Sequence, residues 1–375
     1  MTILFLSHED RPVLGSTLSL YNLIHSLGEG YEAIVVVPAR GPAYDYFTER
    51  GIRCLAVPFH VDFVGSGYNW RYYLTFPIRW LRDRVDNGRA VRHIVRLLHG
   101  ERIDVVHTNT SVLDFGPTLA RHLGAVHVWH LREFINLDMG FEPFRGWEDL
   151  CGRIHGADAV VSITDAIARH FRVAALPQAR VLHDAVRSRR EACLIEPKER
   201  YFVFCGYLVP HKGPDVAVRA FRRFAVTHSD YRLVLLGKFE VETYRAELLA
   251  EAGEAANRLD FRGYVANVGE VVSHATALLM CSANEALGRV TVEAMFYGCP
   301  VIGRNSGGTR EIVRDGETGL LFEDDAQCAE RMTQIAESPE LAHRLAAQAL
   351  RQACDEFSEE TYGAKIRRIY HSLTQ

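Results

Sequence analysis

The feature that most constrains the fold is a regular alternation of short apolar runs with stretches long enough to form amphipathic helices. A strand inside a parallel sheet is apolar on both faces, because helices cover such a sheet on both sides. Strands that alternate with helices therefore predict βαβ units around a parallel, doubly covered sheet. Six runs in the first half of the chain are expected to be strands: Ile3–Ser7, Ala33–Pro38, Cys54–Val57, Ile103–His107, Val126–His130 and Ala159–Ile163.

The same alternation restarts after a polar, proline-containing stretch at Leu194–Arg200, which we interpret as a linker. The 375 residues are enough for two domains, which we expect at 1–190 and 200–357, with a C-terminal helix at 358–375. The pattern leaves open whether that helix crosses back to the first domain. Two Rossmann-like domains of this kind would face each other across a cleft, where ligands bind at the carboxyl ends of the strands. The second set of expected strands comprises Tyr201–Cys205, Leu233–Leu236, Leu259–Arg262, Ala277–Cys281, Pro300–Gly303 and Leu320–Phe322.

Composition argues against several classes of protein. A formal net charge of −4 is too close to neutral for a typical nucleic-acid binder. The eight cysteines include no C-x-x-C pair, which disfavours a zinc ribbon or a dithiol motif and fits a reducing compartment. No apolar run reaches the roughly 18 residues of a membrane span, and the N-terminus lacks the features of a signal peptide. We therefore expect a cytoplasmic protein.

One segment, Val61–Arg102, departs from the alternation and is rich in aromatic residues and arginine. Between Tyr68 and Arg102 the eight arginines and three acidic residues give a local net charge of +5. A basic, aromatic stretch suits contact with an anionic membrane surface or a lipid phosphate. The alternative is a solvated basic helix face with its aromatic residues in the core. The first interpretation would bring the protein to the inner face of the membrane.

The stretch most informative for chemistry runs from Ser282 to Glu311 and begins just after an expected strand. Glu285 falls in the strand-to-helix loop, and Gly288 lies near the start of a helix that ends at Gly298. The N-terminus of a helix presents free N–H groups and positive dipole, which suit a diphosphate. A glycine at that point lets the backbone come close to the ligand.

Glu293 lies five residues beyond Gly288, roughly 7.5 Å along the helix axis. That is too far into the helix for a cap, and it suits a carboxylate that accepts hydrogen bonds from ribose hydroxyls. Glu285, in the loop, would face the sugar end. A second glycine-rich turn, Ser306–Gly308, follows the next strand at the same edge of the sheet. For either glutamate alone, a solvated helix charge is the alternative explanation.

These residues closely resemble the signature of family 4 retaining glycosyltransferases, which have the two-domain GT-B fold. The resemblance covers essentially the whole chain. In the second domain its motifs are Glu285-x7-Glu293 with Gly288, Gly307-Gly308, Glu311-Ile-Val-Arg-Asp-Gly316-x-x-Gly319, Phe204-Cys-Gly206-Tyr-Leu-Val-Pro-His-Lys212-Gly213 and Gly263-Tyr-Val265. In the first domain they are Gly15-Ser16, His107-Thr-Asn109 and Trp129-His130-Leu-Arg132-Glu133-Phe134.

The resemblance implies a role for each of these sites. Glu293 would hold the ribose, Glu285 the sugar hydroxyls, and Lys212 would neutralise the diphosphate as the glycosidic bond breaks. The catalytic candidates are Glu285, His130 and Lys212. The donor-binding candidates are Gly15, Ser16, Gly206, Lys212, Val265, Glu285, Ala286, Leu287, Gly288, Arg289 and Glu293. The acceptor candidates are His107, Asn109, Arg132 and Glu133.

Alternatives stay open for the first-domain residues. His130 would contact the donor sugar or the acceptor, or else be a buried structural histidine, and His107 is equally ambiguous. Arg132 and Glu133 would contact the acceptor, or else pair with each other. All four lie at or just beyond expected strands, where the catalytic groups of α/β sheets gather.

The chain departs from the family pattern at Tyr207, where the family usually has an arginine. Arg289, just after Gly288, is a candidate replacement for that second phosphate cation, and the alternative is that it contacts the acceptor. The sequence contains no Asp-x-Asp pair of the kind that holds a divalent cation in glycosyltransferases of the other main fold. We therefore expect no metal and no cofactor, with the helix dipole and Lys212 supplying positive charge.

We predict a metal-independent retaining hexosyltransferase that uses a UDP- or GDP-sugar and a hydroxyl of a glycan or lipid-linked acceptor. Two alternatives are kept: a nucleotide-sugar epimerase of the same fold, and a non-catalytic sugar-nucleotide-binding partner subunit. The long match from Glu285 to Gly319 disfavours the epimerase, and Tyr207 keeps the non-catalytic subunit in play.

Overall fold

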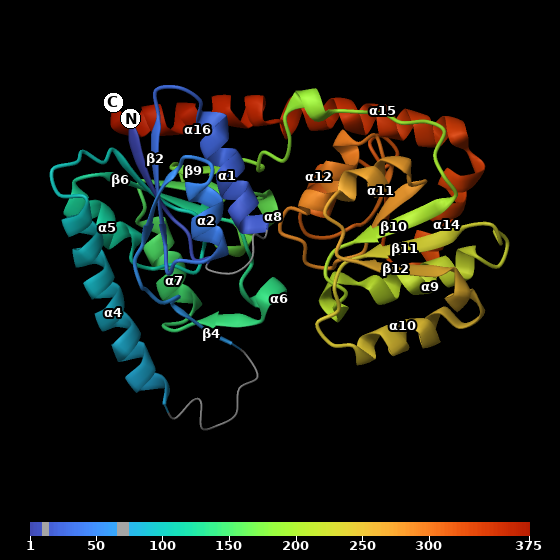
Figure 1. Cartoon of the computed structure of the whole chain (residues 1–375), viewed down its shortest axis with the longest axis horizontal. Coiled ribbons are helices and arrows are strands. Elements are labelled where there is room, and N and C mark those ends of the chain that lie inside the picture. Colours follow the sequence, from blue (N-terminus) through green and yellow to red (C-terminus); the bar gives the residue numbers. More distant parts are fainter. Residues whose placement is uncertain (10–14, 66–74) are drawn as a thin grey trace. The chain divides into compact units, whose positions relative to one another are not determined.

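The computed structural model describes residues 1–9, 15–65 and 75–375 and divides the chain into two compact units. The first unit consists of Met1–Ala185 with Tyr362–Gln375, and the second of Val186–Thr361. Each unit is built around its own parallel sheet with helices packed against it (Figure 1). The predicted α/β fold with two Rossmann-like domains is confirmed. The stretch 194–200 lies in the second unit, where Lys198 donates a 2.7 Å hydrogen bond to the carbonyl of Ser273.

Seven parallel strands form the sheet of the first unit in the order β3-β2-β1-β5-β6-β8-β9. Six of them match the predicted apolar runs. The unpredicted strand, β9, is a three-residue edge strand with an arginine at its centre, so it carries no apolar run. The strands are β1 (Thr2–Leu6), β2 (Glu32–Val37), β3 (Arg53–Ala56), β5 (Val105–Thr108), β6 (Val126–Leu131), β8 (Ala159–Ser162) and β9 (Ala179–Val181), and β4 (Phe63–Gly65) pairs separately with β7 (Phe141–Pro143).

Helices cover both faces of this sheet. Side chains alternate along a strand, so Ile3 and Phe5 join one buried cluster while Leu4 and Leu6 join another. Helices α1 and α16 supply the first cluster, and α4 and α5 supply the second. The helices of this unit are α1 (Gly15–Leu27), α2 (Pro42–Thr48), α4 (Phe76–Leu97), α5 (Gly116–Leu123), α6 (Asn136–Met139), α7 (Trp147–His155), α8 (Asp165–His170) and α16 (Glu359–Thr374), the last from Tyr362 onward.

The second unit contains six parallel strands in the order β12-β11-β10-β13-β14-β15. All six correspond to predicted runs. They are β10 (Tyr201–Cys205), β11 (Arg232–Leu236), β12 (Leu259–Gly263), β13 (Ala277–Met280), β14 (Val301–Arg304) and β15 (Leu320–Phe322).

Apolar side chains of α9, α10 and α14 share one buried cluster with this sheet, while α12 contacts β13 and β14. Figure 1 places α11 and α12 on the side of the sheet opposite α9 and α10. The helices are α9 (Pro214–Phe224), α10 (Thr243–Ala252), α11 (Val268–His274), α12 (Arg289–Phe296), α13 (Thr309–Ile312), α14 (Asp325–Glu337) and α15 (Pro339–Glu356), with short 3-10 turns η1 (Arg189–Glu191), η2 (Pro210–Lys212) and η3 (Gly253–Arg258).

Strand order reverses once in each sheet, between β1 and β5 in the first unit and between β10 and β13 in the second. At such a point the loops that leave neighbouring strands turn to opposite faces, which opens a crevice at the carboxyl edge. The candidate residues His107, His130, Lys212 and Glu285 all lie at or just beyond strands on these edges.

Two separate glycine-to-alanine variants, a test and a control, probe how closely α16 packs against α1 in the first unit. A Cβ at Gly363 would lie 2.1 Å from the carbonyl oxygen of Ser26 on α1, so Gly363→Ala is expected to destabilise the unit by about 1–3 kcal/mol. Urea unfolding followed by tryptophan fluorescence reports on this unit, because all four tryptophans fall within Met1–Ala185.

The matched control is Gly88→Ala on α4, where a Cβ would have no atom within 4 Å. There the better helix propensity of alanine predicts unchanged or slightly higher stability. Equal unfolding midpoints for Gly363→Ala and the unmodified chain would contradict the close contact between the two helices.

Candidate active site

Loops at the carboxyl edge of the second sheet pack against one another at backbone level. A Cβ at Gly213 would lie 2.6 Å from the carbonyl oxygen of Cys281. A Cβ at Gly307 would lie 2.6 Å from the carbonyl oxygen of Glu285, and one at Gly308 would lie 2.4 Å from that of Ala286. The Gly308 N–H also donates to the Glu285 carbonyl at 2.7 Å. These glycines therefore fix the position of the Glu285 loop.

Two of the predicted catalytic residues meet at this edge. Lys212 ends η2, beyond β10, and Glu285 lies in the loop beyond β13. The Lys212 Nζ atom lies 3.0 Å from Glu285 Oε2, and both side chains are partly buried. Residues 73 positions apart thus place one cation and one carboxylate at the point where strand order reverses.

Gly288 caps the N-terminus of α12 with φ of 79°, a left-handed conformation that favours glycine. The first helical residue, Arg289, lies 3.9 Å from Glu293 on the next turn, measured from Nη2 to Oε1. Burial, together with the nearby Glu293 carboxylate, raises the pKa of the Cys205 thiol to about 12. Glu293 therefore lies close to the carboxyl end of β10, as well as on α12.

The remaining donor-binding candidates of this unit line the same edge. Gly206 directly follows β10, and its N–H donates to the Leu236 carbonyl at 2.9 Å. Leu287 is buried in the Glu285 loop, and Val265 lies partly buried just beyond β12. Tyr207 is 44% exposed, and its phenol supplies no cation there.

In the first unit, His107 on β5 and His130 on β6 are completely buried and lie side by side. His107 Nε2 lies 3.1 Å from His130 Nδ1, and the hydroxyl of Tyr370 lies 2.8 Å from His107 Nδ1. Burial lowers the pKa of both histidines well below the usual value, and the Arg132 guanidinium lowers it further. Both imidazoles are therefore neutral at neutral pH.

Arg132 and Glu133 do not pair with each other. The Arg132 guanidinium forms a buried ion pair with Asp184 and donates from Nε to Asn109 Oδ1 at 2.7 Å. Glu133 accepts hydrogen bonds from the Thr110 hydroxyl and, at 2.8 Å, from the Ser111 N–H. All four acceptor candidates are buried within the first unit, so their side chains contact other residues of the protein.

Tyr370 and Asp184 are two residues of this network that are not among the predicted site residues. Tyr370 lies on the C-terminal helix, 263 residues from His107, and in the sequence it looks like an ordinary core aromatic. Asp184 follows β9, the strand that the apolar pattern did not predict. The donor candidates Gly15 and Ser16 are the first residues of α1, and residues 10–14 lie outside the described residues.

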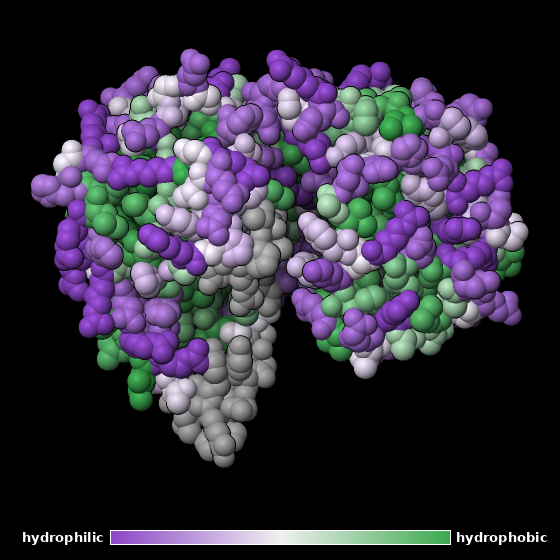
Figure 2. All heavy atoms as spheres, in the orientation of Figure 1, coloured by the Kyte–Doolittle hydropathy of each residue, from purple (hydrophilic) through white to green (hydrophobic). Residues whose placement is uncertain are grey.

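In the described part of the basic aromatic segment, α4 has an outward face that is divided along its length, and residues 66–74 of the segment lie outside the described residues. Near its N-terminal end Ile78, Leu81 and Val85 are 74%, 59% and 43% exposed, and the hydrophobic colour gathers there in Figure 2. One helical turn further, Arg89, Arg92 and Arg96 line a pocket of about 660 Å³ together with Val57, Pro58, His60, Asp86, Ala90 and His93.

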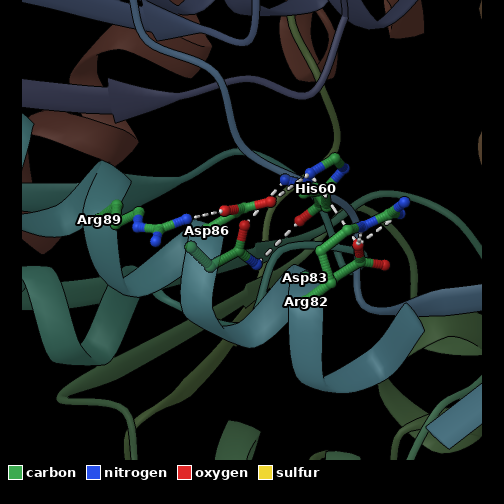
Figure 3. A network of polar contacts seen from close by, with 6 residues as sticks. His60, Arg82, Asp83, Asp86 and Arg89 are labelled. Atoms are coloured by element: carbon green, nitrogen blue, oxygen red, sulfur yellow. Dashed lines mark hydrogen bonds and ion pairs between the residues drawn. The ribbon is translucent and has the colours of Figure 1, made fainter. Parts of the chain in front are cut away.

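The acidic residues of α4 are engaged by neighbouring side chains (Figure 3). Asp86 contacts Arg89 at 2.9 Å and His60 at 3.4 Å, while Asp83 contacts Arg82 at 2.8 Å. The Asn87 side chain on α4 accepts a 2.8 Å hydrogen bond from the backbone N–H of His60 and donates one of 3.0 Å to the His60 carbonyl. Among the helices in the described ranges, none has the length and apolarity needed to cross a bilayer.

Comparison with known proteins gives a family match for most of the second unit. Residues 187–352 match the family model "Glycosyl transferases group 1". The D-inositol 3-phosphate glycosyltransferase of Acidothermus cellulolyticus is 35% identical over 158 residues, 37% of this chain and 33% of that protein. The phosphatidyl-myo-inositol mannosyltransferase of Mycobacterium leprae is 25% identical over 319 residues, 79% of this chain and 76% of that protein. The alignment thus spans about a third of the first relative and about three quarters of the second.

Among solved structures, Anabaena HepE in complex with UDP has a TM-score of 0.81 at 19% identity, over 99% of this chain and 100% of that one. HepE has also been crystallised with UDP-glucose, with a TM-score of 0.78 at 20% identity. This likeness concerns the fold of the whole chain, and the family match concerns its second unit. Together they show a GT-B fold over the whole chain and a match of residues 187–352 to the group 1 glycosyl transferases.

Proposed function

We propose that the chain is a family 4-type retaining glycosyltransferase, independent of metal ions, that transfers a hexose or related sugar from a UDP- or GDP-linked donor to a hydroxyl. One observation carries the proposal: the Lys212–Glu285 pair lies beside the N-terminus of α12, at the carboxyl edge of the unit that matches the group 1 family. This arrangement offers positive charge to a diphosphate and a carboxylate to sugar hydroxyls within one small region.

The proposed chemistry follows from these placements. Glu293 accepts hydrogen bonds from the ribose, and Glu285 accepts them from the sugar. The acceptor oxygen forms a bond to the anomeric carbon on the face from which the leaving group departs. The bond from that carbon to the phosphate oxygen breaks, and a phosphate oxygen takes the acceptor proton. Lys212 and the N–H groups of α12 stabilise the charge that develops on the nucleoside diphosphate.

Where the family usually has an arginine that binds phosphate, this chain has Tyr207. We propose that Arg289 supplies the missing second cation for the diphosphate. Arg289 is the first residue of α12, whose N-terminal N–H groups are proposed to bind the diphosphate. The Arg289 guanidinium lies 3.9 Å from Glu293. A planar guanidinium with several donors suits a phosphate oxygen, whereas the Tyr207 phenol supplies no positive charge.

We propose an acceptor presented at a membrane surface, as a lipid-linked or surface glycan. The support is α4, with an exposed apolar end followed by three arginines, and the name of the M. leprae relative, a phosphatidyl-myo-inositol mannosyltransferase. All eight cysteines are free thiols, which fits a reducing compartment. We therefore propose a cytoplasmic location at the inner face of the membrane.

Incubation with UDP- and GDP-sugars separates the proposal from its two alternatives. A transferase is expected to release nucleoside diphosphate slowly from one donor, to transfer sugar when an acceptor hydroxyl is present, and to keep both activities in EDTA. The anomeric configuration of the product, read by NMR, is expected to match that of the donor. Isomerisation of the sugar without cleavage indicates an epimerase, and binding without either reaction indicates a non-catalytic subunit.

Glu293→Ala is expected to weaken binding of the matching nucleoside diphosphate by about tenfold to a hundredfold, because hydrogen bonds to a charged acceptor are lost. Arg289→Ala is expected to weaken it as well, by removing a phosphate cation. Isothermal titration calorimetry measures both. Glu254→Ala, which changes an exposed glutamate in the same unit, is the control and should bind normally. Unchanged affinity in Glu293→Ala or Arg289→Ala removes that residue from the donor site.

Vesicle sedimentation tests the proposed membrane contact. The chain is expected to bind anionic phosphatidylglycerol vesicles at low salt and to release them as salt rises, because each basic residue near such a surface contributes about 1 kcal/mol. The double variant Ile78→Asp, Leu81→Asp should lose binding. Val226→Asp, at an apolar residue that is 82% exposed in the second unit, is the matched control. Equal binding to neutral phosphatidylcholine vesicles, or by the double variant, would contradict the contact through α4.

A further inference from the structure

A pocket of about 280 Å³ in the first unit lies between α4, α5 and α7. Four arginines from three helices and one loop line it: Arg84 on α4, Arg121 on α5, Arg145 before α7 and Arg153 on α7. Among the described residues that line the pocket, Asp114 alone is acidic. α4 and α5 lie side by side (Figure 1), and α5 begins beyond β5. Because the pocket includes the start of α5, it lies near the carboxyl edge of the first sheet.

The Arg153 guanidinium has one nitrogen without a hydrogen-bond acceptor. Its Nη2 donates to Asp62 at 2.9 Å, and its Nε donates to Asp149 at 2.8 Å. Its Nη1 is buried and lies 3.3 Å from Asp114, but it forms no hydrogen bond with any described residue. Arg145 Nη2 lies 4.0 Å from the same carboxylate, which is beyond hydrogen-bond distance. Buried polar groups without a partner are rare, so Arg153 Nη1 points to a ligand in the pocket.

The positive charge of the pocket is only partly neutralised. Among the described residues, neither Arg84 nor Arg121 forms an ion pair: Arg84 lies over the ring of Trp80 at 5.3 Å, and Arg121 donates to Thr118 Oγ1 at 3.3 Å. Four arginines against the three aspartates that contact them leave a net charge of +1. Phe115 provides no side-chain cap for α5, so the positive end of the helix dipole adds to this charge.

We propose that this pocket binds a phosphate group of the acceptor. A guanidinium can only donate hydrogen bonds, and its planar set of donors suits phosphate oxygens. Donors that come from four segments of the chain surround a ligand on several sides, which suits a tetrahedral phosphate better than a planar carboxylate. The space beyond one phosphate would hold part of the alcohol to which the phosphate is bonded. The acceptor role rests on the proposed function, whereas phosphate binding does not.

Titration of the whole chain with inorganic phosphate at constant ionic strength, followed by tryptophan fluorescence, tests the site. All four tryptophans lie in the first unit, and Trp80 contacts Arg84, so phosphate at the proposed donor site of the second unit contributes no local signal. The unmodified chain should give a saturable change. Arg121→Gln, which leaves Trp80 and Arg84 in place, should weaken phosphate binding by about tenfold to a hundredfold, because a hydrogen bond to a charged group is lost.

The matched control is Arg169→Gln. It changes another exposed helical arginine of the first unit, one whose side chain bonds to Asp165 of its own helix, and it should bind phosphate normally. A fluorescence change of equal size with chloride at the same ionic strength would indicate screening and overturn the site. Equal phosphate affinity in Arg121→Gln and the unmodified chain would overturn it as well.

Glycerol 3-phosphate separates the phosphate of an acceptor from free phosphate. A pocket for the phosphate of a larger molecule should bind this ester and release inorganic phosphate, whereas glycerol alone should not compete. Failure of the ester to compete would indicate a site for free phosphate only and would overturn the acceptor role.

Transfer kinetics test the acceptor role directly. Arg121→Gln should raise the KM for the acceptor by about tenfold and leave the affinity for the nucleoside diphosphate unchanged, while Arg169→Gln should change neither. An unchanged acceptor KM in Arg121→Gln would contradict the role. If the chain transfers no sugar at all, the proposed function fails, while the fluorescence titration still decides whether the pocket binds phosphate.

Discussion

Every strand in the two large sheets runs parallel to its neighbours, so each strand delivers its following loop to the same edge. The placement of the candidate residues depends on this constraint. It brings Lys212, beyond β10, within 3.0 Å of Glu285, beyond β13, although 73 residues separate them. It likewise sets His107 on β5 beside His130 on β6. The strand order also reverses between β10 and β13, and ligands of parallel α/β sheets bind at such a point.

The two units hold their polar groups in different ways. In the second unit, glycines such as Gly213 and Gly308 let one loop backbone touch another, and the side chains of Lys212 and Glu285 remain partly exposed. This arrangement leaves both charged groups partly accessible to solvent. In the first unit the polar side chains are buried and bind one another, with neutral histidines beside the Arg132–Asp184 ion pair. A network of this kind fixes orientation and protonation rather than supplying net charge.

The apolar pattern predicted the strands of both sheets except β9, whose three residues include an arginine. The placement of Glu285 before α12, of Gly288 at its start and of Glu293 within it could also be predicted, because a glycine at a helix start and glutamates at fixed offsets are local features. The side-chain network of the first unit could not. Tyr370 reaches His107 only through the packing of α16 on the sheet, and Arg132 pairs with Asp184 rather than with its neighbour Glu133. Such contacts depend on tertiary packing, which no local spacing encodes.

We propose that a nucleoside diphosphate binds at the carboxyl edge of the second sheet. Amide hydrogen exchange of the whole chain, measured with and without saturating UDP or GDP, tests this binding site. We expect slower exchange with one of the two nucleotides in three segments, at 206–213, 282–293 and 305–309, because they contain Lys212 and Glu285, begin α12 and pack against the Glu285 loop. Bound nucleotide that leaves all three segments unchanged, or protects only other parts of the chain, would contradict it.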